Sequence, residues 1–129
     1  FLLTSVLDVL KNGKTQLAIV DASAACHMPD VLEMPYLPPL LGTDEKGESG
    51  ITVRLGGPTC LSGDVIGDYR FPEEVIAGER LLFGDMAIYT TCKNNTFNGM
   101  PLPGIALLKE DGSVEMVREF GYNDFKMRL

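Results

Sequence analysis

The stretch FLLTSVLDVLKNGKTQLAIVDAS, residues 1–23, consists of two apolar segments joined by the polar tetrapeptide KNGK. Both segments contain Val, Leu and Thr, and the second adds Ile; β-branched side chains favour strands because they pack well on a pleated surface. Asn12 and Gly13 suit a type I′ turn, in which both central residues need a positive φ. The start of the chain therefore predicts a β-hairpin with Asn12-Gly13 at the centre of its turn.

Strand signals recur along the rest of the chain. Short strands are expected at 51–56 (ITVRLG), 78–85 (GERLLFGD) and 86–92 (MAIYTTC). A second hairpin is expected at 105–120, with Asp111-Gly112 at its turn. Together these segments predict a mainly β domain of roughly seven or eight short strands, closed as a barrel or sandwich.

The remaining segments are expected to be loops and short helices. PDVLEM, residues 29–34, suits one helical turn with a proline in its first turn, and the closing segment 118–129 suits an amphipathic C-terminal helix. TDEKGESG, residues 43–50, is a polar surface loop. The Gly-rich run 56–72 is expected to be mostly turn.

Length, charge and cysteine content limit the class of protein. A chain of 129 residues fits one domain. The net charge of −7 argues against nucleic acid or an anionic membrane as a partner. No apolar run approaches the roughly 18 residues of a membrane span. The odd cysteine count and wide spacing indicate free thiols in a reducing compartment, so the cytoplasm is the expected location.

Two loop-rich runs present side chains that could carry chemistry. GGPTCLSGD, residues 56–64, holds Cys60 and Asp64 among glycines that let the backbone turn tightly. Its simpler interpretation is a buried thiol beside a turn acid. MAIYTTCKNNTFNG, residues 86–99, places Tyr89 in a strand and Phe97 in a turn. Its simpler interpretation is a core tyrosine, a hairpin turn and a core phenylalanine.

A third run, DASAACHMPDVLEMPY at residues 21–36, contains the only histidine. His27, Asp30 and Glu33 follow at three-residue spacing and would lie near one face of a helical turn. One histidine with two carboxylates is a weak metal signal, and no metal site is expected. Helix capping and surface roles are simpler, and acidic side chains facing a cationic substrate are a better use of the cluster.

The order and spacing of these runs resemble the C-terminal domain of the fold-type III PLP-dependent decarboxylases, which include the ornithine, diaminopimelate and arginine decarboxylases. The resemblance rests on four features in order: GPTC, then Gly-Asp, then a tyrosine, then TFNG. Together with DASAACHMPDVLEMPY and the closing FGYNDFKMRL, they are most similar to the carboxynorspermidine and carboxyspermidine decarboxylase subfamily. The resemblance covers essentially the whole chain, residues 1–129.

The resemblance implies a two-part enzyme. In the family, an N-terminal (β/α)8 barrel binds pyridoxal 5′-phosphate through a lysine, and the C-terminal β domain completes the site of the partner subunit in a head-to-tail homodimer. This chain matches only the second part, and none of its six lysines resembles the barrel's lysine motif. The chain also opens inside an apolar segment without an initiator Met. We therefore expect the trailing part of a longer protein, inactive without its barrel.

The resemblance also assigns roles to individual residues. Cys60 matches the cysteine that returns a proton to the α-carbon after CO2 has left, a task that suits a thiol. Tyr89 matches a tyrosine whose hydroxyl binds the PLP phosphate. Phe97 matches an aromatic residue near cofactor and substrate at the dimer interface. Asp64 matches an acid that pairs with a barrel lysine across that interface.

The expected substrate is a carboxylated polyamine. Ornithine decarboxylase has an aspartate directly after the cysteine, and this chain has Leu61 there. Glu33, oriented by His27 and Asp30, could instead bind an ammonium group, in a charge-assisted hydrogen bond of about 1.5–3 kcal/mol. Leu37 stands where the family is expected to have arginine.

The leading functional prediction is loss of CO2 from carboxynorspermidine or carboxyspermidine, giving norspermidine or spermidine. Three alternatives remain open at this point. One is the C-terminal domain of a decarboxylase for diaminopimelate or another diamino acid. The second is a β module without catalysis, a split-gene remnant or an excised domain that only binds partners. The third is a free-standing β barrel that binds an unrelated ligand.

Overall fold

The computed structural model describes residues 1–44, 49–87 and 89–129. The expected loop 43–50 therefore lies partly outside the described residues, as does position 88 of the expected strand 86–92. In chain order the elements are β1 (Leu2–Asn12), β2 (Thr15–Val20), α1 (Ala24–His27), α2 (Asp30–Glu33), β3 (Ile51–Gly56), β4 (Val65–Phe71), β5 (Arg80–Phe83), α3 (Tyr89–Cys92), the 3-10 turn η1 (Phe97–Gly99), β6 (Ile105–Leu108), β7 (Val114–Arg118) and α4 (Tyr122–Lys126).

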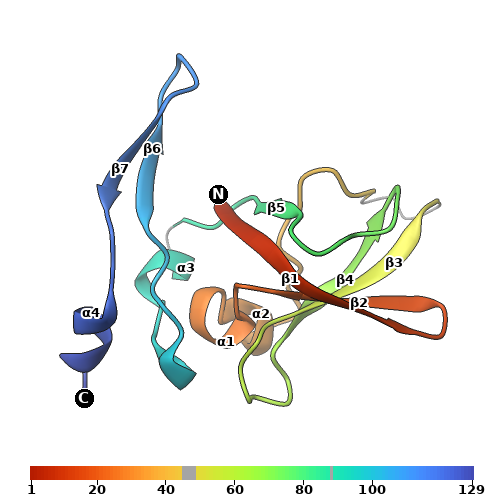
Figure 1. The fold of residues 1–129 in the computed structure, drawn as a ribbon, viewed down its shortest axis with the longest axis horizontal. Coiled ribbons are helices and arrows are strands. Elements are labelled where there is room, and N and C mark those ends of the chain that lie inside the picture. Colours follow the sequence, from red (N-terminus) through yellow and green to blue (C-terminus); the bar gives the residue numbers. More distant parts are fainter. Residues whose placement is uncertain (45–48, 88) are drawn as a thin grey trace.

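Five strands form one curled sheet in the order β4-β3-β2-β1-β5 (Figure 1). β2 and β3 are parallel, and the other neighbours are antiparallel. A register shift between Val6 and Asp8 marks an irregularity of β1, and such bulges bend a strand and increase its twist. The expected mainly β, barrel-like class with short helices and a C-terminal helix is confirmed.

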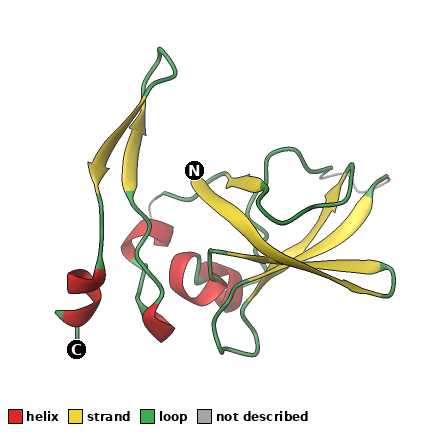
Figure 2. Cartoon of the chain, in the orientation of Figure 1, coloured by secondary structure: helices red, strands yellow, loops and turns green. Residues whose placement is uncertain are grey.

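One apolar cluster holds the sheet together. It includes Val20 of β2, Val53 and Leu55 of β3 and Phe83 of β5, all fully buried. Met28, directly after α1, belongs to the same cluster, so the two short helices are tied to the sheet by apolar packing. Figure 2 shows the short helices α1, α2 and α3 between this sheet and a separate hairpin.

That hairpin is formed by β6 and β7, as expected from the sequence, and α4 follows it. Six large apolar side chains of the hairpin are exposed: Ile105, Leu107, Leu108, Val114, Met116 and Val117. A two-stranded hairpin is only marginally stable by itself in water. The hairpin thus presents an apolar surface on an element with little support from the described chain.

The first hairpin is confirmed, but its turn differs from the prediction. Asn12 pairs with Thr15, so Gly13 and Lys14 are the central residues. Gly13 has a φ of 62°, and neither Asn12 nor Lys14 has a positive φ. This is the pattern of a type II′ turn rather than type I′, because β1 extends one residue further than expected.

Two other expectations about secondary structure are wrong. The run 56–72 was expected to be mostly turn, yet Val65–Phe71 is strand β4, paired along the whole of β3. Its glycines hid a strand in which Tyr69 and Phe71 are buried at alternate positions and Ile66 is buried near its start.

Tyr89 was expected in a strand and instead opens the helical turn α3. The sheet ends at Phe83, and Asp85 with a φ of 57° turns the chain away before residue 86. Without a strand partner, the backbone closes its own turn through a 2.9 Å bond from Lys93 N to Tyr89 O. No helix among the described residues is long and apolar enough to cross a membrane.

Candidate functional site

The loop that carries Cys60 connects β3 and β4, and Asp64 closes it. Asp64 is only 5% exposed, and its carboxylate accepts five hydrogen bonds from the chain. Thr59, next to Cys60, donates its hydroxyl to Oδ2 at 2.6 Å. Ser23 Oγ and Ala24 N donate to Oδ1 at 2.9 and 2.8 Å. The acid therefore ties the Cys60 loop to the beginning of α1.

Gly57 allows this close approach. A Cβ at position 57 would contact the carboxylate of Asp64, with Cγ at 2.7 Å, and the backbone of Ser23, with Cα at 2.8 Å. Backbone and a fully bonded carboxylate cannot move aside cheaply. The first part of the GGPTC motif is therefore explained by packing against Asp64.

A second loop, residues 93–99, is tied to the other end of α1. The side chain of Asn95 donates to Ala25 O at 2.8 Å, and its backbone N donates to Cys26 O at 3.1 Å. The buried thiol of Cys26 contacts Phe97 O at 3.5 Å. Phe97 itself is 46% exposed. The same short helix therefore anchors both the Cys60 loop and the TFNG turn.

The two loops meet at the exposed thiol of Cys60. Its Sγ lies 3.7 Å from Oδ1 of Asn98, in the TFNG turn. This distance is within the range of a hydrogen bond that involves sulfur. Cys60 and Phe97, which the sequence analysis selected separately, are thereby brought onto neighbouring loops.

A group of charged residues lies where α3 meets α2. Lys93 Nζ lies 2.5 Å from Asp30 Oδ1 and 3.0 Å from Glu33 Oε2. The hydrogen bonds that Lys93 donates to Asp30, and then to Glu33, raise the pKa of Lys93 above its ordinary value. The ammonium also lies 5.9 Å from the ring centroid of Tyr89. An internal cation therefore occupies the carboxylates that were expected to bind a substrate ammonium.

His27 does not join Asp30 and Glu33. It ends α1, whereas the two acids belong to α2. Its Nδ1 accepts from Ser23 N and its Nε2 faces Pro101 O, both at 3.0 Å, so Nε2 carries the proton and donates. Burial lowers the pKa of His27 below its ordinary value. Both ring nitrogens thus serve backbone groups in a buried, neutral histidine.

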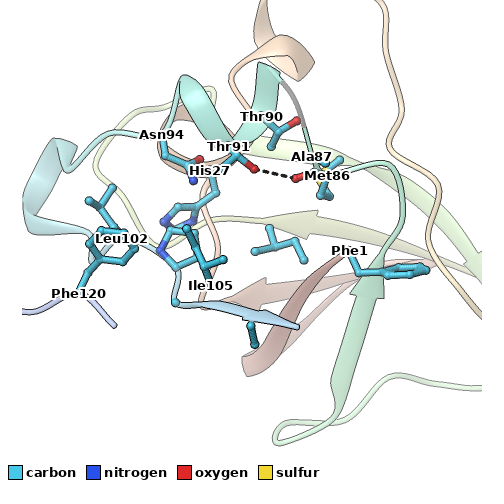
Figure 3. Close-up of a pocket in the computed structure, with 14 residues that line it drawn as sticks. Phe1, His27, Met86, Ala87, Thr90, Thr91, Asn94, Leu102, Ile105 and Phe120 are labelled. Atoms are coloured by element: carbon cyan, nitrogen blue, oxygen red, sulfur yellow. Dashed lines mark hydrogen bonds between the residues drawn. The ribbon is translucent and has the colours of Figure 1, made fainter. Parts of the chain in front are cut away.

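Two pockets bear on the predicted site residues, and a third, of about 170 Å³, also borders His27. The larger, of about 330 Å³, is lined by Phe1, His27, Asn94, Leu102 and Phe120 among others (Figure 3), and includes neither Cys60 nor Tyr89. The smaller, of about 180 Å³, is lined by both Asp30 and Tyr89. The smaller pocket is the better candidate for a binding site, despite its size, because its lining includes both an expected substrate residue and an expected cofactor residue.

The sequence analysis missed three residues that these contacts involve. Ser23, Lys93 and Asn98 each contact an expected site residue. Asn98 had a readable signal, because Asn-Gly pairs mark turns with positive φ. Ser23 before the apolar run 24–26 also has the pattern of a helix N-cap. Lys93 had none, since its ion pairs join positions 60 or more residues apart.

The described residues fit part of a PLP site. Tyr89 is 65% exposed, and within the described part of the chain no hydrogen bond uses its hydroxyl, which leaves that group able to donate to a phosphate. Cys60 presents an exposed thiol. Neither feature could hold the cofactor alone.

Comparison with known proteins identifies relatives. Residues 1–87 match the family described as pyridoxal-dependent decarboxylase, C-terminal sheet domain. The carboxyaminopropylagmatine decarboxylase of Synechocystis is 43% identical over 129 residues, which is 100% of this chain and 33% of that protein. The carboxynorspermidine/carboxyspermidine decarboxylase of Campylobacter jejuni is 40% identical over 138 residues, covering 98% of this chain and 36% of that protein.

A solved structure agrees with these relatives. Carboxynorspermidine decarboxylase from Campylobacter jejuni, complexed with norspermidine, superposes with a TM-score of 0.91 at 38% identity. The alignment covers 98% of this chain and 37% of that one. The chain thus spans about a third of the length of the relatives it matches.

Proposed function

The chain belongs to the pyridoxal-dependent decarboxylase family as its C-terminal sheet domain, and on this premise we propose that it completes an enzyme that removes CO2 from a carboxylated polyamine. The observation that carries the proposal is similarity over nearly all of this chain, at about 40% identity, to decarboxylases named for such substrates. The exposed Cys60 thiol, on a loop fixed by a buried acid, gives this similarity a chemical basis.

Cys60 is proposed as the proton donor. When bound in the barrel of the complete enzyme, PLP supplies the electron sink that allows the C–CO2 bond to break. The S–H bond of Cys60 then breaks, its electron pair stays on sulfur, and the proton joins the carbon that CO2 has left. A proton from water returns to sulfur afterwards and completes the cycle.

Tyr89 and Phe97 are proposed to contact the cofactor. The unused hydroxyl of Tyr89 suits a hydrogen bond to the PLP phosphate. The half-exposed ring of Phe97 lies next to Asn98, the residue that faces Cys60, and suits packing against cofactor or substrate. These contacts would orient the cofactor rather than change its chemistry.

The acids of α2 are proposed to recognise a substrate ammonium. Both acids hold the ammonium of Lys93, and Glu33, the more exposed of the two, would exchange that partner for a substrate ammonium. Leu61 leaves no carboxylate directly after Cys60 and disfavours a short diamino acid such as ornithine. His27 is proposed only to position this region through its two backbone contacts.

Barrel and partner subunit are proposed to cover the surfaces that this chain leaves open. The apolar side chains of β6 and β7 have little other means of burial. Asp64 is proposed to serve assembly chiefly by holding the Cys60 loop, since its carboxylate already accepts five hydrogen bonds. A barrel lysine could add to this network but would have to approach a nearly buried group.

A substrate panel tests the proposal. The complete protein, with PLP, is supplied separately with carboxynorspermidine, carboxyspermidine, carboxyaminopropylagmatine and diaminopimelate, and CO2 release is measured. We expect the highest kcat/KM among the first three. Turnover of diaminopimelate alone would overturn the substrate class, and no turnover of any of them would favour a module without catalysis.

A further inference from the structure

Asn98 has an unusual backbone conformation. Its φ of 59° and ψ of 20° lie in the left-handed region, which only two non-glycine residues adopt in the described part of the chain. Asn tolerates this region better than most residues. Gly99, with a φ of 76°, continues the turn. The turn therefore aims the Asn98 side chain in a direction that an ordinary helical backbone would not provide.

The surrounding contacts hold this turn in place. Phe97 N donates to Asn95 Oδ1 at 3.0 Å, while the carbonyl of Phe97 contacts the Cys26 thiol at 3.5 Å. Asn95 is in turn bonded to Ala25 O at 2.8 Å. The residue before Asn98 is thus fixed through both its N–H and its carbonyl.

The Cys60 loop is fixed to the same helix independently. Asp64 binds Thr59 Oγ1 on one side and Ala24 N on the other, at 2.6 and 2.8 Å. Helix α1 therefore sets the separation of two loops 38 residues apart, and at their meeting point Oδ1 of Asn98 lies 3.7 Å from Sγ of Cys60.

We propose that Asn98 is a positioning residue for the Cys60 thiol. This inference rests on the proposed function of Cys60 as proton donor. The Oδ1 atom accepts the S–H proton and holds the sulfur in one rotamer. Rotation about Cβ–Sγ then turns the proton from Asn98 to the substrate carbon while the sulfur stays in place. Asn98 touches neither substrate nor cofactor in this scheme.

The residue type fits the role. Glycine would keep the left-handed backbone but offer no acceptor, whereas aspartate would tolerate the conformation and place a negative charge beside the sulfur. Asparagine combines left-handed backbone with a neutral acceptor. Asn98→Gly therefore tests the loss of the acceptor oxygen with the left-handed backbone kept. Asn98→Asp tests the effect of a negative charge at the same position.

Alkylation of the thiols tests the contact without PLP. In the complete protein, iodoacetamide labelling at one pH is followed peptide by peptide, with Cys92, an exposed thiol elsewhere, as internal reference. Asn98→Gly should speed labelling of Cys60 about two- to tenfold, the size of one lost hydrogen bond. Asn98→Asp should slow it, because a carboxylate repels the negative charge of the reacting sulfur. Labelling of Cys92 should not change.

Product partition tests the consequence for catalysis. In the PLP-loaded complete enzyme, Asn98→Gly should raise the share of turnovers in which the proton reaches the wrong carbon and PLP is lost by transamination. KM should stay within about twofold of the parent value, since Asn98 does not contact the substrate and the substrate contacts are unchanged. The circular dichroism spectrum and melting temperature check that each variant folds, and Asn98→Asp keeps the test informative if glycine loosens the turn.

The outcomes separate the inference from its premise. Unchanged Cys60 labelling or unchanged partition in Asn98→Gly overturns the role of Asn98. Cys60→Ala, measured in parallel, should itself raise the transamination share. If it does and Asn98→Gly does not, only the inference fails; if Cys60→Ala leaves the share unchanged, the proposed role of Cys60 fails as well.

Discussion

The hydroxyl of Ser23 donates a buried 2.9 Å hydrogen bond to Oδ1 of Asp64, 41 residues further along the chain. Oγ of Ser23 also accepts a hydrogen bond from Cys26 N at 3.2 Å and so caps α1. One hydroxyl thus links the helix that anchors the TFNG turn to the acid that closes the Cys60 loop. Since both side chains are buried, water cannot easily replace either contact.

Asp64→Asn is expected to lower the free energy of unfolding by about 1–3 kcal/mol, because an amide NH2 would replace one of the two acceptor oxygens that face buried donors. Urea denaturation of the variant and the parent measures the change. The loss of stability should be accompanied by faster proteolysis within the loop that carries Cys60.

Asp68→Asn is the matched control. Asp68 pairs with Arg54 at 2.7 Å, but both side chains are about half exposed, and such surface pairs contribute at most about 1 kcal/mol. Equal, small effects of the two changes would contradict the structural role of Asp64. If Asp64→Asn instead weakened only dimerisation of the complete protein, a role in pairing across the subunit interface would be favoured.

The three cysteines are expected to react in two classes. Cys60 and Cys92 are exposed, whereas Cys26 is fully buried, and burial raises the pKa of its thiol. A disulfide reagent should therefore modify two thiols quickly in the folded protein and the third only after denaturant is added. Fast reaction of all three without denaturant would show that α1 does not pack as described.

Stability is expected to fall between neutral and mildly acidic pH because of His27. Burial lowers its folded pKa below the ordinary value of 6.5, so below pH 6.5 the unfolded chain binds more protons than the folded one. The free energy of unfolding therefore falls as pH falls from 6.5 to the folded pKa, and this contribution is fully present above 6.5.

His27→Gln should flatten that pH dependence. His27 is the only histidine of the chain, so melting temperatures measured from pH 7.5 to 5 report mainly on this side chain. The variant should be less stable than the parent at pH 7.5, because one backbone contact is lost, and should converge with it at lower pH. Parallel curves would assign the pH dependence to carboxylates instead.

Glu33→Gln is expected to raise KM for a carboxylated polyamine in the complete enzyme by about tenfold or more, the size of one charge-assisted hydrogen bond. PLP affinity should change less. Glu74→Gln, which breaks an exposed pair with Lys11 at 2.7 Å, is the control and should leave KM unchanged. An equal loss of PLP binding in Glu33→Gln would make Glu33 a structural residue.

Local patterns were sufficient for the elements whose partner is adjacent in sequence. Both hairpins follow from short turns between apolar segments, and the family resemblance followed from motifs in order. Strand β4 was misassigned although its partner β3 directly precedes it, because glycines and a register shift at Gly56 interrupt its pattern. Helix α3 was misassigned because the residues after Phe83 have no strand beside them.

The sequence by itself determined the mainly β class and the family, and it supplied the candidate reactive side chains, because these depend on residue type and order. Only the tertiary structure decided that Asp64 is enclosed by donors, that His27 is separated from Asp30 and Glu33, and that Asn98 faces Cys60. The physical reason is distance along the chain. Contacts between loops 38 or more residues apart leave no local periodicity, and here one four-residue helix creates them.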